Sequence, residues 1–378
     1  MGKIYLPYAS QFDLMNENLA RIANAISSDI DVSTWAGIQK AVRVGVAPDL
    51  IPAGTQLVTN HSKYGEIVFD VVAHNYFKSA HDKNAQTMTL LSHNCLAKAQ
   101  FDAPEAFYYA TDGLSPGTYN FTLSESYGNW AAGTYQFTLS FNLPKGGQLC
   151  ISGRESAGSL TTLEVLSYDD VHETMVTDRA VISVGSGGTS LGTLGVELNH
   201  PHRASYGSNN YKESAIRQFL NSSASAGGVW TPQTKFDRAP EWATSLDGFV
   251  RGFDDDFLSV VGEVVVPCAT NSVYESPDST TVKAQKYTVT DKFYLASQRE
   301  IFGTGSETLA DDTSQFPYYE GATNADRIKY KDGSAAGWWL RSASNLNSGG
   351  ARTVRSDGSL IGQLVQLSYG VVIACTIV

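Results

Sequence analysis

The residues with the clearest chemical potential are a pair of histidines and a run of aspartates. His200 and His202 stand two residues apart, a spacing at which imidazoles sometimes share a metal ion, but no cysteine or carboxylate follows at ligand spacing. Asp254–Asp256 could hold Ca²⁺, yet the later oxygen ligands of an EF-hand-like loop are missing. We interpret the histidines as a solvated turn, and the aspartates as a solvated loop or the start of a helix before Phe257.

The four cysteines do not form a reactive pair in the sequence. Cys95, Cys150, Cys268 and Cys375 are far apart and make no CxxC motif, so the spacings of metal knuckles and redox dithiols are absent. Thiols of this kind are usually small buried hydrophobes. Walker A, His-Glu-x-x-His and Gly-x-Ser-x-Gly motifs are also absent. The sequence therefore predicts no catalytic residues, no cofactor and no metal site, and favours a binding protein over an enzyme.

The segment that favours binding is the C-terminal one, from Gly337 onward. Its two ends, Gly337–Ser342 and Tyr369–Val378, are largely apolar, whereas 343–368 is rich in Ser, Gly, Asn, Gln and Arg with isolated aliphatic residues. A fixed frame around a polar middle predicts a displayed recognition surface. The predicted ligand-binding residues are Ser344, Leu346, Asn347, Ser348, Arg355, Ile361, Gln363, Leu364, Gln366, Leu367 and Tyr369. Because exposed aliphatic groups suit a protein surface better than a sugar, we expect a protein target.

The composition is consistent with a β-rich protein that does not bind nucleic acid. Only 17% of the 378 residues are charged, and the chain has 34 Gly and 19 Tyr, which is typical of sheets and loops. The net charge of −11 argues against a nucleic-acid partner, which needs a basic face. No apolar run reaches the roughly 18 residues of a membrane span. The first residues also lack a secretory signal, so an extracellular role would need another exit route.

A heptad pattern predicts a helix near the start of the chain, over 10–28. Its apolar positions step by three and four residues at Phe12, Met15, Leu19, Ile22 and Ile26. One interpretation is an amphipathic helix packed on its own domain. The other is a self-associating helix, with isoleucine at inner positions favouring a trimer. Two heptads alone are short for a coiled coil, so other contacts would have to contribute.

Further along the chain, strands outnumber helices. We expect helices over 32–44 and 210–221, and strands over 56–58, 67–72, 87–91, 160–166, 180–184 and 293–295. The apolar run 257–266 is expected to include a further strand. The near-repeats Gly117–Leu123 and Gly133–Leu139 alternate apolar and polar residues, as do neighbouring strands of one half-buried sheet. The Gly/Ser/Thr stretch 185–195 is interpreted as a linker or long loop. Arg217 and Arg341 are interpreted as guanidinium groups that fix loops through several hydrogen bonds.

Six segments together resemble a known family. They are Ile67–Val72, Thr89–Ser92, Ser214–Asn221, Asp291–Ser297, Trp338–Ser342 and Gly370–Cys375. Their order resembles C-type-lectin-fold domains distantly related to the formylglycine-generating enzyme, which are abundant in gut bacteria and their prophages. The resemblance implies that the first and last strands of the domain pair. Some phage members are variable proteins of diversity-generating retroelements, whose C-terminal region is rewritten and displayed.

The expected fold is therefore α+β: a C-type-lectin-like fold with an inserted antiparallel β module and an N-terminal helix. We expect an oligomerisation segment over 1–44, a discontinuous lectin-like domain over 45–105 and 196–378, and an inserted module over 106–195. The resemblance implies a receptor-binding protein of a phage tail, located on the virion or outside the cell. Its partner would be a bacterial surface protein, with a glycan as second choice. A structural virion protein and a glycan-active or oxidising enzyme of the same fold remain alternatives.

The heptad pattern gives the first test. If 10–28 self-associates, sedimentation velocity at micromolar protein concentration should show a trimer. A monomer at that concentration would contradict the self-associating helix and leave the packed amphipathic helix.

Overall fold

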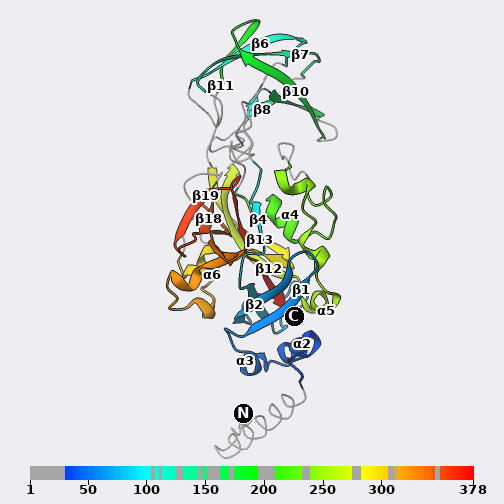
Figure 1. Ribbon diagram of the computed structural model, residues 1–378, viewed down its shortest axis with the longest axis vertical. Helices are drawn as coiled ribbons and strands as arrows, with labels where there is room; N and C mark the ends of the chain where they lie inside the picture. The colour runs from blue at the N-terminus through cyan, green and yellow to red at the C-terminus, as the bar shows by residue number, and fades with distance from the viewer. Residues whose placement is uncertain are drawn as a thin grey trace, which may run out of the picture.

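The computed structural model describes the body of the chain with gaps. The described residues are 30–103, 107–109, 113–124, 131–143, 148–150, 162–169, 174–194, 209–231, 239–274, 282–304, 311, 313–344 and 350–378. The heptad residues, the histidines His200 and His202, and the predicted contact residues Leu346, Asn347 and Ser348 lie outside this part. The fold is mixed α+β, mostly sheet with few helices (Figure 1).

The first sheet of the body has the order β1-β2-β3-β21-β14. These strands are β1 (Gln56–His61), β2 (Gly65–His74), β3 (Met88–Ser92), β21 (Ala374–Ile377) and β14 (Phe293–Tyr294). The last strand, β21, runs antiparallel to β3, with Ala374 opposite Leu91 and Ile377 opposite Met88. Every residue of β3, β14 and β21 is buried, as expected for strands covered on both faces. The last strand, β21, thus lies between β3 and β14, whereas the first strand, β1, pairs with β2. The implied pairing of the first and last strands is therefore wrong for β1 and β21.

The second sheet carries the C-terminal segment, in the order β19-β18-β17-β20-β4. It consists of β19 (Leu360–Leu364), β18 (Gly350–Val354), β17 (Trp338–Ala343), β20 (Ser368–Val371) and β4 (Ala97–Gln100). Trp338 and Trp339 on β17 are completely buried. Two hairpins complete the body: β12 (Val264–Tyr274) with β13 (Val282–Asp291), and β15 (Lys329–Lys331) with β16 (Ser334–Ala336).

Short helices cover the sheets, and α2, α4 and α6 among them have side-chain caps. They are α2 (Trp35–Arg43), α3 (Ala47–Leu50), α4 (Ala215–Leu220), α5 (Asp255–Val260) and α6 (Gln298–Phe302), with 3₁₀ turns η1 (Glu241–Thr244), η2 (Phe249–Gly252), η3 (Pro317–Tyr319) and η4 (Ala325–Arg327). Thr34 caps α2, and Ser214 caps α4. Of the loop and the helix start considered for Asp254–Asp256, the helix start is confirmed, because Asp254 precedes α5 and its first turn is acidic. The strand expected within 257–266 begins only at Val264, since α5 occupies the first part of this run.

A separate seven-stranded sheet lies at one end of the molecule, opposite the end that holds α2 and α3 (Figure 1). Its order is β11-β6-β7-β10-β9-β8-β5. The strands are β5 (Phe107–Tyr109), β6 (Gly117–Leu123), β7 (Gly133–Leu139), β8 (Gln148–Cys150), β9 (Thr162–Asp169), β10 (Thr174–Val184) and β11 (Thr189–Leu194). The two near-repeats are β6 and β7, which pair antiparallel along their whole length, so their predicted pairing is confirmed.

The predicted linker over 185–195 is wrong, because most of it is strand β11. This strand pairs with β6 in parallel, so the sheet is not purely antiparallel. The connection from β10 crosses β7 and β6 and is held by two amide side chains. Asn120 Nδ2 donates to the carbonyl oxygens of 186, 187 and 188, and Gln136 Oε1 accepts from the Gly187 N–H at 2.9 Å. The small glycine and serine residues of this connection therefore let it pass close to β7 and β6.

A buried histidine fixes the junction of β1 with η2. The His61 side chain lies among aromatic rings, 5.4 Å from Phe249 and 4.8 Å from Phe253 between centroids. Its Nδ1 accepts from the N–H groups of Lys63 and Tyr64, so the remaining Nε2–H donates to the Phe249 carbonyl at 2.9 Å. The neutral ring therefore uses both nitrogens. A Cβ added at Gly252 would lie 2.1 Å from the imidazole, so only glycine fits beside it.

This arrangement predicts an acid sensitivity. Burial lowers the pKa of His61 below its ordinary value of about 6.5. Below pH 6.5 His61 binds a proton in the unfolded chain but stays neutral in the folded protein. The free energy of unfolding therefore falls as the pH falls. His61→Gln keeps a donor without the titration. The stability difference between the wild type and this variant, measured by urea unfolding, should shrink from pH 7.5 to pH 5. A pH-independent difference would contradict this role.

Candidate recognition site

The predicted recognition segment contains an antiparallel hairpin of β18 and β19. Thr353 is opposite Ile361, and Ala351 is opposite Gln363. The turn between the strands closes with the Arg355 N–H donating to the Ser359 carbonyl at 2.8 Å. Gly358 has a φ of +80°, and a Cβ there would lie 1.7 Å from the Asn324 carbonyl oxygen. The turn is therefore seated tightly against Asn324, which holds the tip of the hairpin in place.

The other end of the hairpin is anchored by a buried asparagine. Asn209 Nδ2 donates to the carbonyl of Gly350 at 2.9 Å and lies 3.4 Å from that of Ser344, while its Oδ1 accepts from Thr270 at 3.1 Å. Ser344 is only 2% exposed, and its N–H donates to Gly350. The prediction that Ser344 is a surface contact residue is therefore wrong, because this buried residue bonds to the base of the hairpin.

Gln366 is the second correction in the predicted contact set. Gln366 belongs to the turn 365–367. The first residue of this turn, Val365, is buried, and its carbonyl accepts from the N–H groups of Phe101 and Asp102. The Gln366 carbonyl accepts from Gln100 Nε2 at 2.8 Å, and the residue is 8% exposed. Gln366 is thus part of the support. Tyr369 is half-buried with its ring 5.1 Å from Trp339, so it also packs on the frame.

Five members of the predicted set remain accessible, and we call them the hairpin group. They are Arg355, Ile361, Gln363, Leu364 and Leu367. Arg355 is exposed in the turn, and the other four are half-buried. Ile361, Leu364 and Leu367 do not join the main hydrophobic core, unlike the neighbouring Leu360. The structure therefore brings aliphatic groups and an uncharged amide together on a fixed hairpin.

Strand β17, next to the hairpin, is fixed by a completely buried arginine. Arg341 Nη1 donates to Glu300 Oε2 at 2.7 Å, Nη2 donates to Glu300 Oε1, and Asp311 Oδ2 lies 3.3 Å away. The same guanidinium donates to the carbonyls of Pro267 and Leu295. Burial raises the pKa of the Glu300 carboxyl, and Arg341 offsets this by stabilising its charge. The arginine thus ties β17 to α6, β12 and the end of β14.

Arg217 has an analogous role near α4. Its Nε lies 2.9 Å from both carboxylate oxygens of Asp291, and its Nη1 donates to the Lys212 carbonyl at 3.0 Å. The interpretation of Arg217 and Arg341 as structural is therefore confirmed. Sequence analysis missed their partners Asp291, Glu300 and Asp311. Only Glu300 has a local signal, since Ser297 and Glu300 form a capping box at the start of α6.

The described thiols of Cys95, Cys268 and Cys375 and the amine of Lys329 are buried. Burial raises the pKa of the Cys95 thiol to about 11 and of the Cys268 thiol to about 12, and it raises that of Cys375 further. Burial lowers the pKa of the Lys329 amine to about 8, but this amine is 4% exposed and donates to the carbonyls of Ser92 and His93. These groups stabilise the interior, where no substrate has access to them.

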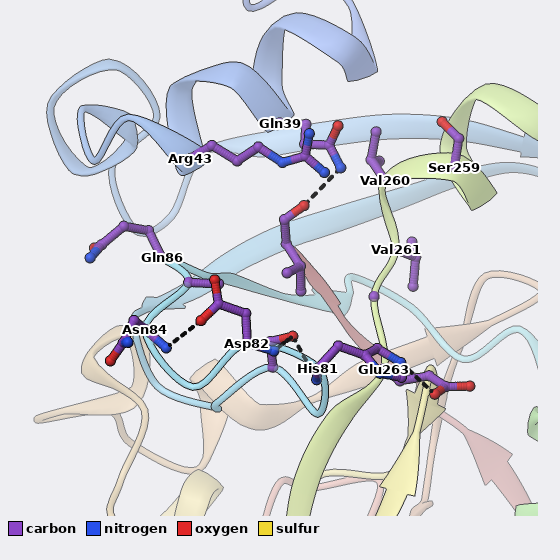
Figure 2. Close-up of a pocket in the computed structure, with 14 residues that line it drawn as sticks. Gln39, Arg43, His81, Asp82, Asn84, Gln86, Ser259, Val260, Val261 and Glu263 are labelled. Carbon is purple, nitrogen blue, oxygen red and sulfur yellow. Dashed lines mark hydrogen bonds and ion pairs between the residues drawn. The ribbon is translucent and has the colours of Figure 1, made fainter.

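A polar groove lies beside α2, at the end of β21 (Figure 2). Its volume is about 640 Å³, within the roughly 300–1,000 Å³ of small-molecule sites. Gln39 Nε2 donates to the Val378 carbonyl at 2.7 Å on one side, and His81 Nε2 lies 3.1 Å from Glu263 Oε2 on another. The His81 side chain is 77% exposed. Its walls combine Val260, Val261 and Val378 with polar side chains and are not predominantly apolar, so we assign no ligand to it.

Metal-binding clusters and membrane-spanning helices are both absent among the described residues. There, no group of three or more His, Cys, Asp or Glu side chains is arranged to hold a metal ion. Within the same residues no helix has the length and apolar character needed to cross a membrane.

The buried ion pair of β17 generates a stability prediction. Glu300→Gln should reduce the free energy of unfolding by about 3–5 kcal/mol, because it leaves the Arg341 charge buried with only Asp311 to balance it. The control is Asp332→Asn, which breaks a pair with Lys331 whose aspartate is 82% exposed. That change should cost less than about 1 kcal/mol. Equal losses in urea unfolding would contradict the role given to Glu300.

Comparison with known proteins gives one result at the level of the family. No curated protein and no solved structure matches the chain. A family model described as a domain of unknown function, DUF6273, matches residues 172–378, which include the hairpin group, Arg341 and Glu300. Because the match covers more than half of the sequence, the chain belongs to the DUF6273 family.

Proposed function

We propose that this protein is a receptor-binding protein that recognises a protein on a bacterial surface through the hairpin group. The observation that carries the proposal is the combination of half-buried aliphatic side chains with a hairpin fixed at both ends. Gly358 seats its tip against Asn324, and Asn209 holds its base. A binding surface that is ordered before contact loses little conformational entropy on binding.

The aliphatic character of the hairpin group favours a protein receptor over a glycan. Ile361, Leu364 and Leu367 are partly accessible and outside the main core. Buried apolar area contributes roughly 25 cal/mol per Å² on association, whereas sugar sites depend mainly on polar contacts. The one charged member, Arg355, lies in the turn, at the rim of the surface.

We also propose a C-type-lectin-like identity for the body and a phage-tail or prophage setting. The buried position of the Trp338–Arg341 motif supports the lectin-like fold. In this setting a trimer would present three hairpins, and avidity would strengthen weak single contacts. A nearby reverse transcriptase gene with a near-copy of the codons for the C-terminal segment would support diversification by a retroelement.

Binding to bacterial cells tests the recognition surface. The double variant Leu364→Lys, Leu367→Lys places charge on the proposed contact surface. For labelled protein on a panel of gut bacteria, it should reduce binding to strains that bind the wild type by more than tenfold. The measurement is flow cytometry with and without protease treatment of the cells, because a protein receptor should be lost on treatment.

The matched control is Val58→Lys on β1, which changes another exposed aliphatic residue, 48% exposed, on the edge strand of the first sheet. It should bind like the wild type. Val58→Lys should keep a melting temperature close to that of the wild type, since surface changes usually alter stability by less than about 0.5 kcal/mol. Leu364 and Leu367 are half-buried, so binding by the double variant is compared at a temperature well below its own melting temperature. Undiminished binding by the double variant would contradict the proposed surface.

A further inference from the structure

The hairpin ends at a strand that has only one neighbour. β19 is the outermost strand of the second sheet and pairs with β18 alone. All five of its residues, Leu360–Leu364, are half-buried, so neither face of the strand is closed off. Within the described residues no chain segment pairs with its outer side.

The register shows which backbone groups are open. The Arg355–Ser359 pair is hydrogen-bonded, and in an antiparallel ladder hydrogen-bonded and non-hydrogen-bonded pairs alternate. Ile361 and Gln363 therefore direct their N–H and C=O groups toward β18. Leu360, Gly362 and Leu364 direct theirs outward. The Leu364 carbonyl accepts from the Leu367 N–H at 3.0 Å, so the outward set is three N–H groups and the carbonyls of Leu360 and Gly362.

Other groups of the body hold two further edge sites, β14 and the His61 end of β1. At β14, Asn221 Nδ2 donates to the Phe293 carbonyl at 2.9 Å, and Asn221 Oδ1 accepts from the Phe293 N–H. At β1, His61 bridges to Phe253, and the next N–H, of Ser62, donates to Gly252. Proteins usually protect free edges with charge, proline or a cover. β19 has the sequence Leu-Ile-Gly-Gln-Leu, which contains no charge and no proline.

Glycine at the centre of this edge faces Ser344, whose Oγ would lie 3.1 Å from an added Cβ. Gly362 has no side chain to project from the strand, and its neighbours are aliphatic or amide residues. The outward backbone donors and acceptors at residues 360, 362 and 364 match the backbone of an extended chain. They do not match a small ligand. These are the features of strand addition, in which main-chain hydrogen bonds give affinity and alternate side chains give specificity.

We propose that the free edge of β19 binds an extended strand of the receptor protein, which becomes the sixth strand of the second sheet. This inference rests on the proposed function and specifies the form of the target. The incoming strand pairs with Leu360, Gly362 and Leu364 through its backbone. Its side chains lie beside Ile361 and Gln363 on one face and Leu364 on the other.

Amide hydrogen exchange by NMR tests whether the edge is open. In the free protein the N–H groups of Leu360 and Gly362 should exchange quickly, and those of Ile361 and Gln363 slowly. Slow exchange at Gly362 in the free protein would overturn the proposal, since the edge would already be covered. Protection that increases with protein concentration would also overturn it, because a second copy of this chain would then be the occupant.

Two variants at Gly362 test the proposed hydrogen bond from its outward N–H to the incoming strand. Gly362→Pro removes the outward N–H without removing a ladder bond, and the preceding Ile361 is already extended, as a residue before proline must be. Gly362→Ala is the control, since its Cβ meets the same Ser344 Oγ at 3.1 Å but the N–H remains. Both variants should have similar melting temperatures. In the cell-binding assay, Gly362→Pro should bind at least tenfold more weakly than Gly362→Ala.

The outcomes separate this inference from the proposed function. If the Leu364→Lys, Leu367→Lys variant loses binding but Gly362→Pro binds like Gly362→Ala, the recognition surface stands and strand addition is overturned. If the double-lysine variant binds like the wild type, the proposed surface fails, and strand addition at it fails with it. Loss of binding in both the double-lysine variant and Gly362→Pro, with Gly362→Ala retained, supports both.

Discussion

The buried guanidinium of Arg341 is the interaction on which the rest of the body depends. It is completely enclosed and is balanced by Glu300 and Asp311, which come from segments far from β17 in the chain. A charge without water must have its hydrogen bonds supplied by the protein, so two carboxylates and two backbone carbonyls converge on this one side chain. β17 is thereby fixed relative to α6 and β12, and the β18–β19 hairpin is built on β17.

The surface that results differs from a flexible loop that varies freely. Its tip is closed by Gly358 against Asn324, its base by Asn209, and its last turn by Gln100. Sequence change is therefore tolerable at Ile361, Gln363, Leu364 and Leu367, whose side chains do not carry these bonds. Ser344 and Gln366 are buried, so a change of their side chains would disturb the packing of the support. A recognition surface and its scaffold can thus alternate residue by residue in one short segment.

The sequence predicts the elements whose pattern is local. The paired near-repeats, the helix at 215–220 and the structural roles of Arg217 and Arg341 are confirmed. The pattern failed where tertiary contacts decide. An acidic helix start divides the apolar run 257–266, and amide side chains turn the Gly/Ser stretch after β10 into a crossing that leads to β11. The burial of Ser344 and Gln366 could not be predicted, because Asn209 and Gln100 that support them lie far away in sequence. The heptad helix and the domain boundaries stay predictions.

The attachment of the seven-stranded sheet has a consequence for how such a protein can change. Before the chain departs, the Asp102 N–H is bonded to Val365 and its carboxylate accepts from Ala215; after the chain returns, Asn209 is locked beneath the hairpin. Both points of attachment are thus held by the body's own bonds. Related proteins could therefore enlarge, shrink or exchange the seven-stranded sheet while keeping the same body. The sheet and the body can thus evolve at different rates.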